Sequence, residues 1–167
     1  MNFLIFYFTL VISLILAKLY PYFYYISFFI LILPLWFYNF EKFGLFKIKG
    51  FIYGLLASII YFPFLSGFSF SLLNQFPQIF AEEIFFRGYI QNELSKRFNN
   101  HLAIIITSFL FSLPHLILSF SILSVLTFFP SIIFGYLYYY SKSIWASSIF
   151  HFFSNMFFQL FLIEFLI

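Results

Sequence analysis

The sequence predicts an all-α fold: a polytopic membrane helix bundle of about seven transmembrane helices. Of the 167 residues, 64% are hydrophobic and only 8% are charged, whereas a soluble domain carries about 25% charged residues. The apolar residues also form seven runs of roughly 20 residues, the length that a helix needs to cross a bilayer. Because lipid satisfies no backbone hydrogen-bonding groups, each run is expected to be helical. The composition excludes a soluble enzyme and a nucleic-acid partner.

The seven apolar runs follow one another without a linker, an internal repeat or a second domain. We therefore expect a single integral membrane domain over residues 1–167. A loop is predicted at Asn74–Gln78, with Pro77 in the first helical turn, where its missing N–H costs nothing. The predicted spans are Phe3–Leu19, Tyr22–Phe40, Phe51–Leu73, Pro77–Phe98, Leu102–Phe120, Ile122–Tyr140 and Ile144–Leu166.

Basic residues predict the orientation of the bundle. They follow the second, fourth and sixth spans, which end on one side of the membrane. These residues are Lys42, Lys47, Lys49, Lys96, Arg97 and Lys142. Only Lys18 falls on the other side. The positive-inside rule then places the N-terminus in the cytoplasm and the C-terminus outside. We expect an integral protein of a prokaryotic plasma membrane.

Two residue types are absent, which narrows the chemistry. The sequence has no cysteine and no aspartate, and all five acidic residues are glutamates. A disulfide, a thiolate metal site and a cysteine nucleophile are excluded, and so is an aspartyl intramembrane protease. No histidine is followed by glutamate, so the zinc motif His-Glu-x-x-His is absent as well.

The fourth apolar run contains Glu82, Glu83 and Arg87. Each charge costs about 3 kcal/mol near the centre of a membrane, so each needs a partner. Glu83 and Arg87 are four residues apart, share a helix face and are expected to form an ion pair. Glu82 lies about 100° away around the helix. We therefore expect Glu82 to require a different partner, which could be a water or a metal.

Two histidines also lie inside apolar runs. His115 follows Pro114, which frees a backbone carbonyl and can bend the helix to make room for a cavity. His151 and Asn155 are four residues apart and point to the same side of their helix. His101, at a loop edge, is expected to be solvated. Glu82, His115 and His151 therefore predict one polar cavity between three apolar helices.

Hydrolysis is the chemistry that fits these residue types, by either of two routes. A carboxylate can act as general base on a water that a histidine orients, while a second histidine and an asparagine amide stabilise the oxyanion. Alternatively, Glu82, His115 and His151 could hold Zn²⁺ with an open coordination position. The residue types leave both routes open.

Three short motifs resemble one membrane-protein family. They are Glu-Glu-x-x-x-Arg at Glu82, Glu83 and Arg87, Phe-x-x-x-His at Phe111 and His115, and His-x-x-x-Asn at His151 and Asn155. In this order, each in its own apolar run, they resemble the CPBP family of CAAX prenyl endopeptidases and bacteriocin-processing proteases, also called Abi. The resemblance covers Pro77–Phe157.

The resemblance implies an intramembrane endopeptidase that cleaves membrane-associated peptides or proteins. It implies that Glu82 and His115 activate water and that His151 and Asn155 stabilise the oxyanion. Glu83, Arg87 and Phe111 are implied to support the site. The family has been described both as metal-dependent and as glutamate-dependent. We favour the glutamate route without a cofactor, and keep Zn²⁺ as the alternative.

Two other functions compete with this hypothesis. One is a non-catalytic membrane protein of the same fold, such as an immunity protein or scaffold, although a scaffold has no reason to bury Glu82, His115 and His151 together. The other is a proton-coupled transporter, because buried glutamates and histidines also build proton relays. A transporter is expected to have broken helices with glycine pairs near the midplane, and no glycine falls beside the glutamate pair.

The depths of the candidate residues do not match in straight, upright helices. At about 1.5 Å per residue, Glu82 and His115 each lie about 8 Å from the outer ends of their spans. His151 lies about 10 Å from the cytoplasmic end of its span. A shared cavity therefore requires tilt, a broken helix or shifted boundaries.

Overall fold

The computed structural model describes residues 3–64 and 70–162, and within these ranges every regular element is helical. The predicted all-α class is confirmed for this part of the chain. At the N-terminus, α1 (Phe3–Ala17) and α2 (Phe23–Ile32) form an antiparallel hairpin that continues into α3 (Pro34–Phe37). The hydroxyls of Ser13 and Ser27 hydrogen-bond across the hairpin at 2.8 Å.

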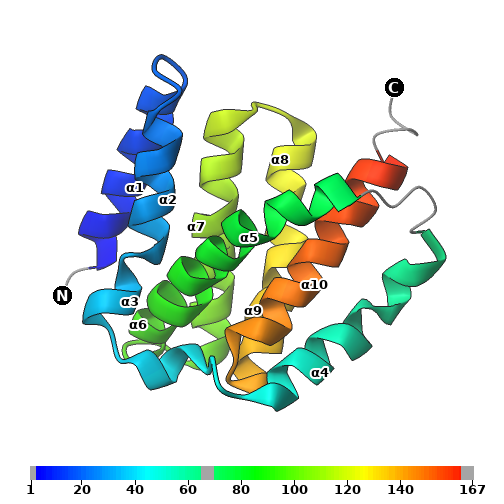
Figure 1. Cartoon of the computed structure of the whole chain (residues 1–167). Helices are drawn as coiled ribbons and strands as arrows, with labels where there is room; N and C mark the ends of the chain where they lie inside the picture. Colours follow the sequence, from blue (N-terminus) through cyan, green and yellow to red (C-terminus); the bar gives the residue numbers. More distant parts are fainter. Residues whose placement is uncertain (1–2, 65–69, 163–167) are drawn as a thin grey trace.

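The remaining elements are α-helices together with several 3-10 and π-helical segments. They are η1 (Phe40–Phe43), α4 (Ile48–Ser58), η2 (Ile59–Phe64), η3 (Phe70–Gln75), α5 (Phe76–Glu83), η4 (Ile84–Gln91), α6 (Asn92–Ser95), α7 (Asn100–Leu118), α8 (Ile122–Leu126), α9 (Phe128–Ser141), α10 (Ile144–Phe157) and η5 (Phe158–Leu162). In Figure 1, α5 runs obliquely across the molecule with α10 alongside it, and α4 lies on the outer side of α10.

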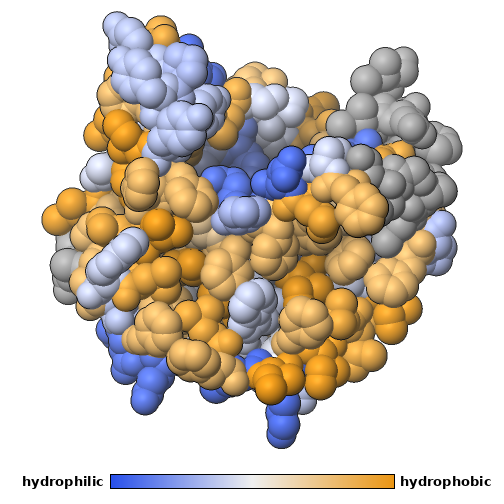
Figure 2. All heavy atoms as spheres, in the orientation of Figure 1, coloured by the Kyte–Doolittle hydropathy of each residue, from blue (hydrophilic) through white to orange (hydrophobic). Residues whose placement is uncertain are grey.

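Three described segments are long and apolar enough to cross a membrane: Phe40–Phe64, Asn100–Leu118 and Ile122–Ser141. Two further apolar helices, Phe3–Ala17 and Phe23–Phe37, are shorter. The predicted number of about seven spans is therefore not confirmed. Much of the surface is nonetheless hydrophobic (Figure 2), and large apolar side chains are exposed along most helices. This surface is that of an integral membrane protein, because exposing so large an apolar area to water would be unfavourable.

The predicted span Phe51–Leu73 is less regular than expected. Helix α4 gives way at Ile59 to the 3-10 turn η2, which contains Pro63. Proline cannot donate the backbone hydrogen bond that would continue the α-helix. Residues 65–69 of this span lie outside the described ranges. The predicted loop at Asn74–Gln78 is wrong, because η3 runs directly into α5; Pro77 does lie in the first turn of α5, as predicted.

The helical segment from Phe76 to Ser95 contains Glu82, Glu83 and Arg87. Its middle, Ile84–Gln91, is a π-helix of eight residues, all buried. A π-helical stretch is rare and frequently lies at a functional site, and no residue pattern in the sequence predicts it. Gly88 in this stretch lets η1 approach closely, because a Cβ atom there would lie 2.3 Å from the ring of Phe43.

The loops at one end of the molecule are fastened together. Ser143 Oγ donates to the carbonyl of Gly44 at 2.8 Å, and Trp145 Nε1 donates to the carbonyl of Leu45 at 2.8 Å. Gly44 adopts a left-handed conformation with φ 61°, where a Cβ atom would lie 1.9 Å from the carbonyl oxygen of Lys142. The basic loop after α3 therefore rests on the basic turn between α9 and α10.

The chain segment after the π-helix joins the same end. Asn92 in α6 hydrogen-bonds with the hydroxyl of Tyr138 in α9, and that hydroxyl donates to the carbonyl of Lys42. Hydrophilic side chains gather along the lower edge of the view in Figure 2, below a broad hydrophobic region. The three basic segments expected to share one side of the membrane thus meet at one end of the fold.

Replacing Gly44 with alanine tests this fastening. The substitution forces a left-handed conformation that costs about 1–2 kcal/mol for an L-residue, and it places a methyl group against the Lys142 carbonyl. We expect the melting temperature of the purified protein to fall by at least about 3 °C, measured by thermal unfolding in detergent. Thr9→Ala on the exposed face of α1 is the control. An unchanged melting temperature for Gly44→Ala would show that the loop is not held as described.

Candidate active site

A cavity of about 360 Å³ lies between the α1–α2 hairpin, the α5–η4 helix and α7. Its walls are mostly apolar, and its polar side chains come from three of these elements. The lining residues are Leu10, Leu14, Tyr24, Ser27, Leu31, Gln78, Glu82, Phe86, Pro114, His115 and Leu118. Figure 2 shows hydrophilic side chains at a hollow in the upper half of this face. An apolar pocket with a few converging polar groups is the usual form of a small-molecule or peptide site.

Glu82 is the carboxylate of this cavity. Its side chain is 18% exposed, and its Oε1 accepts a hydrogen bond from Gln78 Nε2 at 3.0 Å. Its Oε2 lies 4.0 Å from His151 Nε2. The expectation that Arg87 would leave Glu82 to another partner agrees with this geometry. Its nearest polar partners are an uncharged amide and a histidine.

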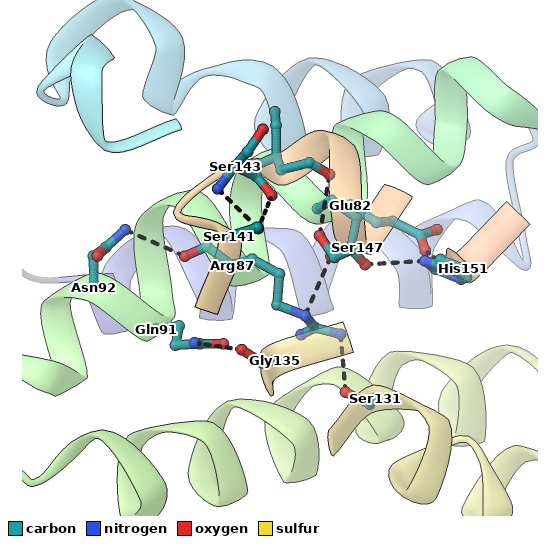
Figure 3. Close-up of polar contacts among 12 residues, drawn as sticks. Glu82, Arg87, Gln91, Asn92, Ser131, Gly135, Ser141, Ser143, Ser147 and His151 are labelled. Atoms are coloured by element: carbon teal, nitrogen blue, oxygen red, sulfur yellow. Dashed lines mark hydrogen bonds and ion pairs between the residues drawn. The ribbon is translucent and has the colours of Figure 1, made fainter. Parts of the chain in front are cut away.

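Glu83 points the other way and is fully buried. Its Oε2 lies 3.3 Å from Arg87 Nε, with both side chains 0% exposed, so the predicted ion pair is confirmed. Its Oε1 lies 3.0 Å from His151 Nδ1. Arg87 reaches α9 as well, donating from Nη2 to Ser131 Oγ at 3.0 Å (Figure 3). Both oxygens of Glu83 are therefore engaged by protein groups.

The two histidines are each oriented through Nδ1. His115 Nδ1 lies 3.0 Å from the carbonyl oxygen of Phe111. A carbonyl can only accept, so Nδ1 carries the proton and the neutral ring leaves a lone pair on Nε2. The same argument applies to His151, whose Nδ1 faces the Glu83 carboxylate. In both rings Nε2 is the atom left available to a water or a substrate.

Phe111 packs among the charged and polar groups of the site. Its ring centroid lies 4.7 Å from that of His115 and 5.5 Å from that of His151. The Arg87 guanidinium lies over the same ring at 4.9 Å, within the range of a cation–π interaction. Phe134 stacks on His151 from the other side, with centroids 4.4 Å apart. These rings fix both imidazoles and keep water from the buried ion pair.

Pro114 does not break α7, which continues from Asn100 to Leu118. Proline at this position leaves the carbonyl of Leu110 without its helical donor. The hydroxyl of Tyr7 in α1 donates to that carbonyl at 3.0 Å. The freed carbonyl thus fastens α1 to α7 beside the cavity.

The expected residues do not all meet. Glu82 and His115 line one cavity and His151 approaches Glu82, because the oblique α5 brings the fourth span to the α10 face. Asn155 lies half-buried one turn beyond His151 and makes no side-chain hydrogen bond with any residue that the structure describes. Its role in the site stays a prediction. His101 is exposed near the start of α7, bonded to Tyr136, and lies apart from the site.

The three donors proposed for Zn²⁺ do not form a metal-binding set. Within residues 3–64 and 70–162, no group of three or more histidine or acidic side chains is arranged to hold a metal ion. Glu82 and His115 line the cavity, but His151 does not, and its Nε2 lies 4.0 Å from Glu82 Oε2. We therefore derive no chemical step through a metal.

Sequence reasoning missed Gln78 and Ser131. Gln78 is four residues before Glu82, the same spacing that identified the Glu83–Arg87 pair, so the helical rule could have found it. Ser131 is 44 residues from Arg87, and no local pattern connects them. Tyr7 was missed for the same reason.

A comparison with models of protein families identifies the family of the chain. The family model of the type II CAAX prenyl endopeptidases, described as Rce1-like, matches residues 63–157. The chain belongs to this family. The match confirms the resemblance seen in the three motifs and includes every candidate site residue from Glu82 to Asn155. No curated protein and no solved structure matches the chain. The α1–α2 wall of the cavity precedes the matched region of this Rce1-like protein.

Arg87→Ala tests the buried ion pair. Removing the cation leaves the fully buried Glu83 without its counterion, and breaking a buried pair costs about 3–5 kcal/mol. We expect a large loss of folded protein, measured as the monodisperse yield after size-exclusion chromatography. Arg97→Ala, which removes an exposed cation, is the control. Normal yield and folding with lost activity would instead place Arg87 in the chemistry.

Proposed function

We propose that this chain is an intramembrane endopeptidase that hydrolyses peptide bonds of membrane-associated peptides or proteins with a water activated by Glu82. The observation that carries the proposal is that the two adjacent glutamates have different surroundings. Glu83 contacts Arg87 and His151 in the interior, whereas Glu82 lines a cavity together with His115. A carboxylate with no cationic counterion and a route to substrate is suited to general-base catalysis.

The proposed reaction begins with a water held between Glu82 and Nε2 of His115. Glu82 removes a proton as the water oxygen bonds to the carbonyl carbon of the peptide. The oxyanion that forms needs hydrogen-bond donors, and the amide of Asn155 is proposed as one. The apolar walls suit an apolar side chain next to the scissile bond, because a polar one would lose its hydration there.

His151 is proposed to move the proton to the leaving amine. Its Nε2 carries a lone pair and lies 4.0 Å from the Glu82 carboxylate, so one bridging water or a side-chain shift of about 1 Å would let it accept the proton that Glu82 removed. The resulting imidazolium is stabilised by Glu83, bonded to Nδ1. It can then hydrogen-bond to the oxyanion and afterwards transfer its single Nε2 proton to the amine nitrogen as the carbon–nitrogen bond breaks. The two products are a carboxylic acid and an amine, and each enzyme group returns to its starting state.

We propose that the basic end of the fold faces the cytoplasm of a prokaryotic cell, in accordance with the positive-inside rule. Phe6, near the start of α1, stacks on Phe37, just before the basic loop. This contact supports a cytoplasmic N-terminus. The other apolar helices are proposed to complete a bundle of about seven spans with the three long ones, which leaves the C-terminus outside.

Glu82→Gln tests the general base. The amide keeps the shape of the side chain but cannot take a proton, so we expect cleavage to fall by about 100-fold or more. The assay is co-expression with candidate membrane peptides, read as the fraction cleaved. The matched variant Glu83→Gln is expected to lower folded yield, because it removes the counterion of Arg87. A folded Glu82→Gln protein that still cleaves at the native rate would refute the proposed role.

Metal dependence is tested on purified, active protein. The proposed route needs no metal, so a chelator should leave the cleavage rate unchanged, and elemental analysis should find no stoichiometric metal. If chelation abolishes cleavage and added Zn²⁺ restores it, the glutamate–water route is wrong. The assignment as an endopeptidase would survive that result.

A further inference from the structure

A second hollow, of about 410 Å³, lies at the basic end of the molecule, away from the residues of the catalytic cavity. It is lined by Leu45, Phe46, Ile48, Phe51 and Trp145. Phe46 is 87% exposed and Ile48 79% exposed, so these side chains face the surroundings rather than the core. The groove is formed where the loop before α4 meets the first turn of α10.

Lysines border this groove from two parts of the chain. Lys47 stands between Phe46 and Ile48 in the sequence, and Lys42 lies in η1, which precedes this loop. Lys142 is placed against this loop by the close approach of its carbonyl to Gly44 and by the hydrogen bond from Ser143 to Gly44. The positive charge beside the groove is therefore assembled by the fold.

These lysines have no acidic partner among residues 3–64 and 70–162. Among the described residues, no carboxylate lies within ion-pair distance of Lys42, Lys47, Lys49 or Lys142. Glu41 is next to Lys42 in the sequence but forms no ion pair with it. Lys142 Nζ lies 4.2 Å from the ring centroid of Tyr139, a contact that leaves its charge uncompensated. Burial, and then the nearby ammonium groups of Lys42 and Lys47, lower the pKa of Lys142. An anion between these groups would relieve their repulsion.

We propose that this surface binds an anionic phospholipid, with an acyl chain along the apolar groove and the phosphate among Lys42, Lys47 and Lys142. The occupant must be amphiphilic, because unpaired cations and a strongly apolar groove adjoin. It must also be available where the helices meet the membrane surface. Basic sites beside spanning helices attract anionic headgroups, and Trp145 is the kind of residue that lies at a membrane interface.

The test uses the fluorescence of Trp145. The chain has two tryptophans, Trp36 and Trp145, so Trp36→Phe leaves a single reporter in the groove. The variant is reconstituted into phosphatidylcholine vesicles that contain a small fraction of brominated phosphatidylglycerol or of brominated phosphatidylcholine. Bromine quenches tryptophan on contact. We expect the brominated phosphatidylglycerol to quench Trp145 several-fold more effectively at equal content.

Charge-matched variants separate a specific site from general surface attraction. Lys42→Ala with Lys47→Ala, in the Trp36→Phe background, should lower the preference by up to about fivefold per lysine. Lys96→Ala with Arg97→Ala removes two charges from the same end outside the groove and should leave it unchanged. If the first pair reduces folded yield, Lys47→Ala alone carries the comparison. Equal quenching by the two lipids, or an equal effect of the two charge pairs, would overturn the proposal.

Discussion

The buried contact between Glu83 and Arg87 organises this fold. Taking either ion out of water costs several kcal/mol, and the attraction between them compensates only when the remaining hydrogen-bonding capacity is also used. Here Arg87 Nη2 reaches Ser131 in α9 and Glu83 reaches His151 in α10, whereas Arg87 Nη1 has no hydrogen-bond acceptor among the described residues. The need to satisfy one ion pair therefore draws three helices together. The aromatic rings of Phe111 and Phe134 then exclude water from it.

The same constraint explains why two adjacent glutamates differ in burial and in their partners. Glu83 lies four residues before Arg87, on the same helix face, and is fixed in the interior by this ion pair. Glu82 turns toward the cavity, where Gln78 restrains one carboxylate oxygen without neutralising it. A neutral amide can orient a base without removing its charge, whereas a cation at this position would hold the carboxylate in its ionised form and weaken it as a base. The cluster thus places a buried, ion-paired acid next to one that faces the cavity.

The sequence predicts those features that depend on residues close to one another along the chain. The span Ile122–Tyr140 corresponds closely to the observed Ile122–Ser141, because hydrophobicity and polar breaks determine its limits. The Glu83–Arg87 pair followed from a four-residue spacing. The Tyr7–Leu110 bond joins residues 103 positions apart and depends on the packing of α1 against α7, so no local pattern contains it. The number of spans is not confirmed either, because an apolar run does not specify where a 3-10 turn will interrupt its helix.

The contacts of Nδ1 in the two histidines determine which ring nitrogen is available in each. A helix places its residues in order but does not determine which nitrogen of an imidazole is free. That choice depends on an acceptor at Nδ1, supplied to His115 by its own helix and to His151 by Glu83. The two acceptors differ in charge, because one is a backbone carbonyl and the other is a carboxylate. In the proposed reaction, the carbonyl orients His115 toward the water, whereas the carboxylate of Glu83 would stabilise an imidazolium at His151. In the proposed reaction, the groups behind these two similar side chains would therefore give them different tasks, and the ion pair with Arg87 holds the Glu83 carboxylate in place behind His151.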